Sequence, residues 1–240
     1  MPDSPTSVHE HPPHYGLDIE TDTTIDGLDP STSPVVAVAV SAVGSDTVLT
    51  GAEDELLAEL EALLRSLPPG VIITWNGSSF DLPFLVHRAA LLGVPLGLSL
   101  HDPSAPVPVG VAAPVWPPPP DGFRATWGEH SHLDGFRLYR ADVRRTVGLS
   151  CGLKAMARLV GLPVVEVDRA GIHDLSPAEL EAYVCSDARL ARQLVARRLP
   201  AALASVDRGP VPVAAPSPTA HDRGVPRLAP GTSGPLVVDG

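Results

Sequence analysis

Four acidic side chains stand far apart in this 240-residue chain, each in a local sequence that could direct it to a common site. Asp18 and Glu20 end an apolar run, Asp81 follows an Asn-Gly turn, and Asp187 comes four residues after Tyr183. Alternate residues of a strand share a face, and residues i and i+4 share a face of a helix. Converging carboxylates can hold hard cations such as Mg²⁺. Because paired metal ions are a recurrent device for phosphodiester cleavage, the pattern favours a metal-dependent nuclease.

Strands and helices that could position these residues follow one another along the chain. Hydrophobic periodicity and turn residues predict strands at 15–20, 35–43, 47–50 and 71–75, and helices at 53–67, 80–92, 150–159 and 176–199. Ser150 is expected to cap the third helix. Ser176, with Pro177 and Glu179, predicts a capping box at the start of the fourth. Strands first, then a strand–turn–helix unit, then helices indicate an α/β fold with a mixed sheet.

Length and composition predict one folded domain with loose ends. Apolar residues make up 44% of the chain, which is enough for one full core. The 28 prolines are clustered rather than spread evenly. We therefore expect a flexible N-terminus at residues 1–13, a domain at 14–199 with a Pro-rich loop at about 102–122, and a disordered tail at 200–240.

The net charge of −11 argues against a simple nucleic-acid binder, which would be basic. Bound cations would offset part of the carboxylate charge, and a phosphate backbone responds to the local field rather than to the total. Basic residues are concentrated in the second half of the chain, at Arg124, Arg137, Arg140, Arg144, Arg145, Lys154 and Arg158. The charge therefore leaves a nucleic-acid partner open.

Compartment is inferred from the cysteines and from the first residues. Cys151 and Cys185 form no CxxC pair, so reduced thiols in a cytoplasmic protein are favoured over a disulfide. The first residues lack the basic start and apolar run of a signal peptide. Because no run approaches the ~18 apolar residues of a membrane helix, no membrane partner is expected.

The local sequences around the carboxylates resemble the exonuclease motifs of the DnaQ-like DEDD superfamily, which has the RNase H-like fold. Three segments carry the resemblance: residues 18–21, residues 76–81, and Tyr183 with Asp187. The tyrosine four residues before the last aspartate is typical of the DEDDy branch. Residues 75–85 are similar to YprB and to polymerase-B-like predicted exonucleases. The resemblance covers roughly residues 14–199 and implies a mixed central sheet flanked by helices.

The resemblance also implies roles for the acidic residues and the tyrosine. Asp18, Glu20 and Asp187 would ligate the metal that activates water. Asp18 would bridge to a second metal, which Asp81 would also hold. Tyr183 would orient the attacking water. The expected cofactors are two divalent cations, Mg²⁺ or Mn²⁺.

The expected substrate is the 3′ end of single-stranded DNA or RNA, cleaved to nucleoside 5′-monophosphates. By the resemblance, Asn76 and Phe80 would line the substrate channel, where an aromatic ring can stack on a base, and Lys154 would contact phosphate. Asp134 is interpreted as structural, at a position that could lie near the site. Histidines at 9, 11, 14, 130 and 132 have spacings that could bind transition metals, but terminus and strand-end positions are favoured for them.

Two other classes of function stay open. A non-catalytic nucleic-acid-binding module or partner subunit could retain the RNase H-like fold, and divalent ions would then not stabilise it. An oligomeric scaffold could use the Pro-rich loop and tail, because Pro tracts bind aromatic grooves. The motifs do not choose between DNA and RNA, and they leave the biological pathway, the physiological metal and the oligomeric state open.

Overall fold

The computed structural model describes residues 11–102, 122–144 and 150–198, which belong to one compact unit, residues 1–209. Its strands are β1 (His14–Thr21), β2 (Val35–Ala42), β3 (Ser45–Thr50), β4 (Val71–Thr74), β5 (Leu98–His101), β6 (Arg124–Trp127) and β7 (His130–Asp134). Its α-helices are α1 (Glu53–Ser66), α2 (Asp81–Leu92), α3 (Gly135–Tyr139), α5 (Leu153–Leu159) and α6 (Pro177–Ala196). A π-helical turn, η1 (Arg140–Arg144), and a 3₁₀ helix, η2 (Arg169–Asp174), complete the described elements.

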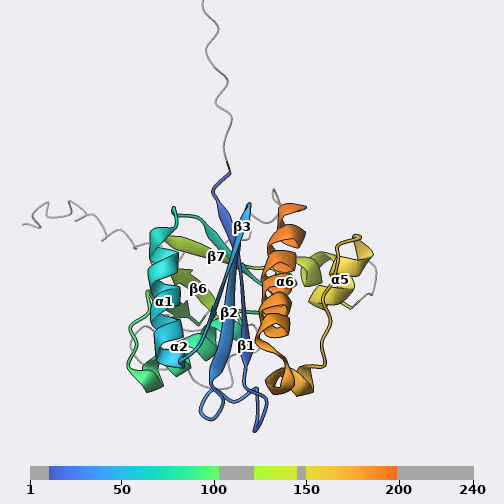
Figure 1. The fold of residues 1–240 in the computed structure, drawn as a ribbon. Coiled ribbons are helices and arrows are strands. Elements are labelled where there is room, and N and C mark those ends of the chain that lie inside the picture. The colour runs from blue at the N-terminus through green and yellow to red at the C-terminus, as the bar shows by residue number, and fades with distance from the viewer. Residues whose placement is uncertain (1–10, 103–121, 145–149, 199–240) are drawn as a thin grey trace, which may run out of the picture. The chain divides into compact units, whose positions relative to one another are not determined.

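The seven strands form one mixed sheet in the order β3-β2-β1-β4-β7-β6-β5. β1 pairs antiparallel with β2 but parallel with β4, and β4 pairs parallel with β7. Figure 1 shows this sheet nearly edge-on, between helices on either side. Because β1, β4 and β7 run in one direction, their carboxyl ends meet at the same edge, which is where ligands bind in open α/β sheets.

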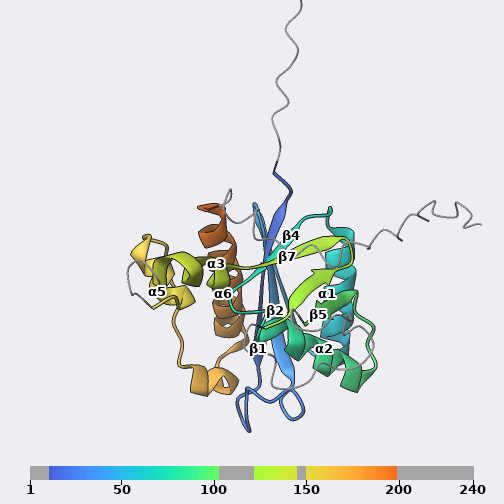
Figure 2. The ribbon, with the colours of Figure 1, turned by 180° about the vertical axis from the view of Figure 1, so that it is seen from behind.

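Helices cover both faces of the sheet, with α1 and α2 on one face and α6, α5 and α3 on the other (Figures 1 and 2). The alternation of side chains along β1 explains this division. Tyr15, Leu17 and Ile19 are buried in a core cluster with the leucines of α1. The intervening residues Gly16 and Asp18 therefore point to the opposite face, toward α6.

Small residues allow α6 to approach the sheet closely. Ala37 and Ala39 of β2 pack against Val184 and Ala188 of α6 in a buried cluster of their own. On β1, a Cβ atom added to Gly16 would lie 1.9 Å from the carbonyl oxygen of Ala188. Only glycine fits this crossing, which brings the polar face of β1 against α6.

The predicted RNase H-like α/β fold is confirmed, and most predicted elements agree with the structure within a few residues. The capping box at Ser176 and Glu179 is present. The prediction of Ser150 as a helix cap is wrong. α5 begins at Leu153 after Gly152, with no side-chain cap, because Ser150 lies too early and its hydroxyl accepts a hydrogen bond from the Gly152 amide at 3.4 Å.

Strands β5 and β6 were not predicted from the sequence. Each has four residues, which is too short for a clear period of two. They pair antiparallel with each other at the edge of the sheet and flank the Pro-rich segment. The predicted flexible N-terminus, Pro-rich loop and tail fall largely on residues 1–10, 103–121 and 199–240, outside the described residues, and stay predictions.

Two further observations concern the cysteines and the apolar character of the helices. Within the described part of the chain, neither Cys151 nor Cys185 forms a disulfide. Among the residues that the structure describes, no helix has the length and apolar character to cross a membrane.

Gly16→Ala is expected to lower the free energy of unfolding by about 1–3 kcal/mol or more, the range for adding a methyl group to a packed core. The added Cβ would meet backbone of α6, which cannot rotate away. Denaturant unfolding measures the change. Gly171→Ala is the control, since its nearest neighbour would be 3.8 Å away, and it should stay within about 0.5 kcal/mol of the wild type. A Gly16→Ala protein of unchanged stability would show that α6 does not lie this close to β1.

Candidate active site

Three carboxylates meet where the end of β1 faces α6. Asp18 and Glu20 are alternate residues of β1 and project from one face of the sheet, toward the helix that carries Asp187. Oxygen atoms of the three carboxylates all lie within 4.8 Å of one another. Asp187 is only 2% exposed. A compact, partly buried set of oxygen donors is the ligand type that Mg²⁺ and Mn²⁺ prefer.

Asp81 adds a fourth carboxylate from the side of α2. It is the first residue of that helix and is 5% exposed. Burial raises the pKa of Asp18 well above its usual range, and the three neighbouring carboxylates raise it further, while the Lys154 ammonium lowers it. The metal-free cluster is therefore under like-charge repulsion, which a bound cation would relieve.

Lys154, on the first turn of α5, places its ammonium group inside this cluster. It forms an ion pair with Asp187 and donates a hydrogen bond of 2.8 Å to the Val165 carbonyl. The same ammonium lies 4.3 Å from the ring centroid of Tyr183. Lys154, which was predicted to contact phosphate, therefore lies beside the carboxylates.

A cavity of about 960 Å³ contains the carboxylates in its lining. Its other walls come from the loop after β1, the β4–α2 turn, α3, α5 and η2, through residues that include Thr23, Leu28, Trp75, Asn76, Phe80, Phe136, Lys154, Arg158 and Ile172. Asn76 and Phe80, which were predicted to bind substrate, therefore lie on the cavity wall. Tyr183 is buried, with 1% exposure, and is not among the described residues that line the cavity.

An ion pair on the far side of the sheet holds the loop that follows β1. The Arg88 Nε donates to Glu53 Oε1 at 2.8 Å, and the same oxygen accepts from the Val35 amide at 2.7 Å. Arg88 also donates to the Pro30 carbonyl at 3.1 Å. Because α2 carries both Arg88 and Asp81, the helix that positions a carboxylate also fixes the loop whose Leu28 lines the cavity.

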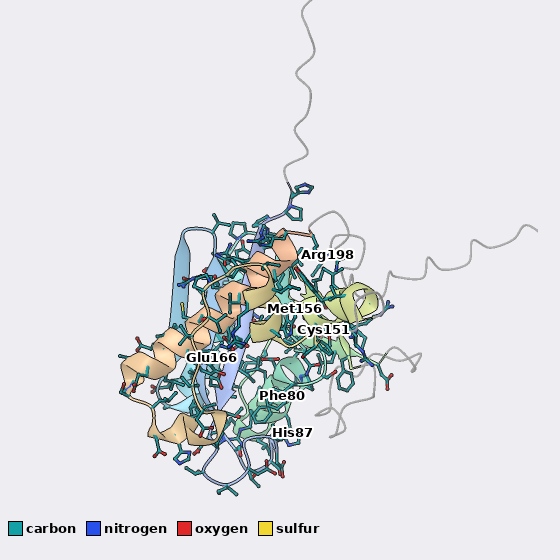
Figure 3. The ribbon with its side chains drawn as sticks, turned by 90° about the vertical axis from the view of Figure 1, so that its right-hand side faces the viewer. Phe80, His87, Cys151, Met156, Glu166 and Arg198 are labelled. Carbon is teal, nitrogen blue, oxygen red and sulfur yellow. The ribbon has the colours of Figure 1, made fainter. Side chains whose placement is uncertain are left out.

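Several cavity residues were not predicted from the sequence. Leu28 is 68% exposed, Phe136 is half-buried at the start of α3, and Ile172 is a buried residue of η2. The available signals were an apolar residue in the loop after β1 and an aromatic residue two positions after Asp134. In Figure 3, which looks onto the face of the sheet that carries α6, Phe80 lies at the start of α2, below the labelled Cys151.

Other sequence candidates have structural contacts instead. His130 is buried, bonded to the Gly70 amide and the Leu64 carbonyl, and His132 contacts the Thr74 hydroxyl at 2.9 Å. These contacts explain both histidines without a metal. Among the basic residues, Arg158 lines the cavity and pairs with Glu166.

Comparison with known proteins relates part of the chain to DNA polymerases. Residues 38–99 match the family described as DNA polymerase family B, exonuclease domain, a span that includes Asp81. DNA polymerase 2 of Aeropyrum pernix is 33% identical over 86 residues, which are 34% of this chain and 11% of that polymerase. A DNA polymerase of Thermococcus aggregans is 43% identical over 101 residues, 40% of this chain and 5% of the relative. The chain therefore spans only a small part of the polymerases that it matches.

A solved structure shows the same fold. The family B DNA polymerase from the hyperthermophilic archaeon Pyrobaculum calidifontis superposes with a TM-score of 0.57 at 21% identity, covering 79% of this chain and 25% of that one. The resemblance to DEDD 3′→5′ exonucleases, drawn from the motifs, is confirmed by the match of residues 38–99 to the family B exonuclease domain. The solved structure confirms the RNase H-like fold.

Asp18→Asn is expected to raise the melting temperature in EDTA, because it removes one charge from a cluster that repels itself. The same change should abolish most of the rise in melting temperature that Mg²⁺ or Mn²⁺ causes in the wild type. Thermal unfolding with and without metal measures both effects. Asp54→Asn, on the exposed side of α1, is the control and should change neither. An Asp18→Asn protein with a lower melting temperature in EDTA, or with the full metal-induced rise in melting temperature, would contradict this account of the cluster.

Proposed function

We propose that this protein is a metal-dependent 3′→5′ exonuclease that hydrolyses single-stranded DNA or RNA to nucleoside 5′-monophosphates. The observation that carries the proposal is the convergence of Asp18, Glu20 and Asp187 within 4.8 Å, with Asp81 close enough to raise the pKa of Asp18. The match to family B exonuclease domains supports the reaction class.

The four carboxylates would together hold two divalent cations. Asp18, Glu20 and Asp187 would hold one, and Asp81 together with Asp18 would hold the other. When bound, the two cations supply an activated water and neutralise charge on the phosphate. The partial burial of the carboxylates limits competition from bulk water, and their anchoring on β1, α2 and α6 keeps the donor positions fixed.

Tyr183 and Lys154 are proposed to act beside these carboxylates. Tyr183 would orient the attacking water through its hydroxyl group, since it lies one helical turn before Asp187. Lys154 pairs with Asp187 in the metal-free protein. Once Asp187 is engaged with a cation, the ammonium would be released to contact a substrate phosphate, the role that the sequence resemblance assigns to it.

Apolar side chains on the cavity wall support an unpaired strand as the substrate. Leu28, Phe80 and Phe136 give its wall apolar surface on which unstacked bases can lie, and the Arg140 guanidinium lies 6.0 Å from the Phe136 ring centroid. Asn76 adds a polar side chain for the sugar or base. We place the protein in a reducing compartment such as the cytoplasm, where cysteines stay as thiols.

The purified protein should shorten 5′-labelled single-stranded oligonucleotides from the 3′ end as a ladder, with Mg²⁺ or Mn²⁺ and not in EDTA. Asp81→Ala should lower kcat by about 10²-fold or more, the scale for removing one group that stabilises transition-state charge. Parallel DNA and RNA substrates show which sugar is preferred. Asp54→Ala is the control. A folded protein that binds metal and cleaves neither polymer would favour the non-catalytic binding module.

Tyr183→Phe should lower kcat by about tenfold to a hundredfold and leave KM unchanged. This loss lies at or below the lower end of the effect of groups that assist proton transfer, which is about a hundredfold. The hydroxyl is lost while the buried ring is kept. Tyr139→Phe is the matched control. The Tyr139 hydroxyl donates a 2.9 Å hydrogen bond to the Leu194 carbonyl, and Tyr139 does not line the cavity. That variant should lose stability but keep kcat. An unchanged kcat in Tyr183→Phe would remove the tyrosine from the mechanism.

A further inference from the structure

A buried carboxylate outside the cavity lining connects two of the cavity walls. Asp134 ends β7, opposite Thr74 at the end of β4, and is 6% exposed. We propose that Asp134 is a positioning residue that fixes Asn76 and Phe136, on two separate walls, in the geometry that holds the nucleotide strand. This inference rests on the proposed exonuclease function and adds a residue to it.

The contacts of Asp134 are to backbone amides on both walls. Its Oδ1 accepts hydrogen bonds from the Asn76 amide at 2.9 Å and from the Phe136 amide at 3.0 Å. Its Oδ2 accepts from the Ser78 amide at 3.2 Å. Asn76 and Ser78 belong to the β4–α2 turn, whereas Phe136 belongs to α3. One side chain therefore joins segments about 60 residues apart in the chain.

The three hydrogen bonds of Asp134, which we call the Asp134 clamp, hold a β4–α2 turn whose backbone conformation is uncommon. Asn76 has a φ of 70°, the one positive φ among the described non-glycine residues. A Cβ atom on Gly77 would lie 2.4 Å from the Thr74 hydroxyl oxygen, so the turn is pressed against the end of β4. On its other side, the Phe123 amide donates to the Ser78 carbonyl at 2.8 Å. Without the carboxylate, the Ser78 amide would be buried without this acceptor.

The clamp governs the substrate wall more than the metal site. Asn76 and Phe136 line the cavity, but Asp134 does not. Asp81 follows the same turn, to which α2 is joined by the hydrogen bond from the Leu82 amide to the Gly77 carbonyl at 3.0 Å. The side chains of Leu82, Phe84 and Leu85 nevertheless hold α2 in the core. Loosening the turn should therefore displace the groups that hold the strand while leaving the carboxylates in place.

Asp134→Asn tests this inference with a nearly isosteric side chain. The asparagine amide keeps one acceptor oxygen and replaces the other with an NH2 donor. Depending on its orientation, this NH2 group would face either the Ser78 amide or the Asn76 and Phe136 amides, which are themselves donors. We expect KM for a single-stranded oligonucleotide to rise about tenfold, equivalent to ~1.4 kcal/mol, with kcat and Mn²⁺ affinity changed much less. Asp134→Ala, which removes all three acceptor contacts, should raise KM further.

Glu61→Gln is the matched control variant. Glu61 is also a buried carboxylate that ties backbone together, accepting from the Gly97 amide and the Trp127 indole at 2.7 Å each, and it lies outside the cavity lining. Its replacement should lower stability and leave KM unchanged. Equal KM values in Asp134→Asn and wild type, or equal rises in Asp134→Asn and Glu61→Gln, would overturn the positioning role.

Amide hydrogen exchange gives a readout that needs no substrate. In the wild type, the Asn76, Ser78 and Phe136 amides should exchange slowly. In Asp134→Asn or Asp134→Ala, at least one of these amides should exchange faster. The amides of β1 and α6 should exchange at unchanged rates. Oligonucleotide binding in Ca²⁺, measured by fluorescence anisotropy, should weaken in parallel.

If the wild-type protein cleaves no nucleic acid, the exonuclease proposal fails. Altered exchange confined to these amides would still support the clamp. Unchanged exchange at all three positions would contradict it.

Discussion

Like-charge repulsion among buried carboxylates is the constraint on which this structure depends. Asp18 lies near three other acidic groups, and both burial and their charges raise its pKa. Such a cluster opposes folding unless a cation or a proton is taken up. The packing of the rest of the domain must therefore hold the carboxylates together, and the chemistry follows from that enforced proximity.

Close packing of α6 on the sheet provides this restraint. Gly16 and the alanines of β2 allow the helix backbone to approach β1, so Asp187 reaches the carboxylates that alternate with the core residues of β1. On the opposite face, α1 and α2 pack on the apolar residues of the same strand. One strand thus supplies core packing on one face and clustered carboxylates on the other. Lys154 offsets part of the charge while no metal is bound.

The sequence allowed prediction of features that depend on local spacing. Alternation placed Asp18 and Glu20 on one face of a strand, and the i to i+4 relation placed Tyr183 on the helix of Asp187. The capping box at Ser176 was equally local. Asp134 was interpreted as structural, but its hydrogen bonds to the Asn76 and Ser78 amides were not predictable in this way, since they join segments that only the sheet topology brings together. Leu28, which is exposed, and Phe136, which is half-buried, were missed because an isolated apolar residue carries no pattern until the cavity around it is known.

The most direct test of the central claim is a crystal structure of the protein soaked in Mn²⁺, with the ions located by anomalous scattering. The account predicts one ion among Asp18, Glu20 and Asp187, a second beside Asp81, and a Lys154 ammonium displaced from Asp187. A soaked crystal with no anomalous peak at these carboxylates, and with Lys154 still paired to Asp187, would contradict it.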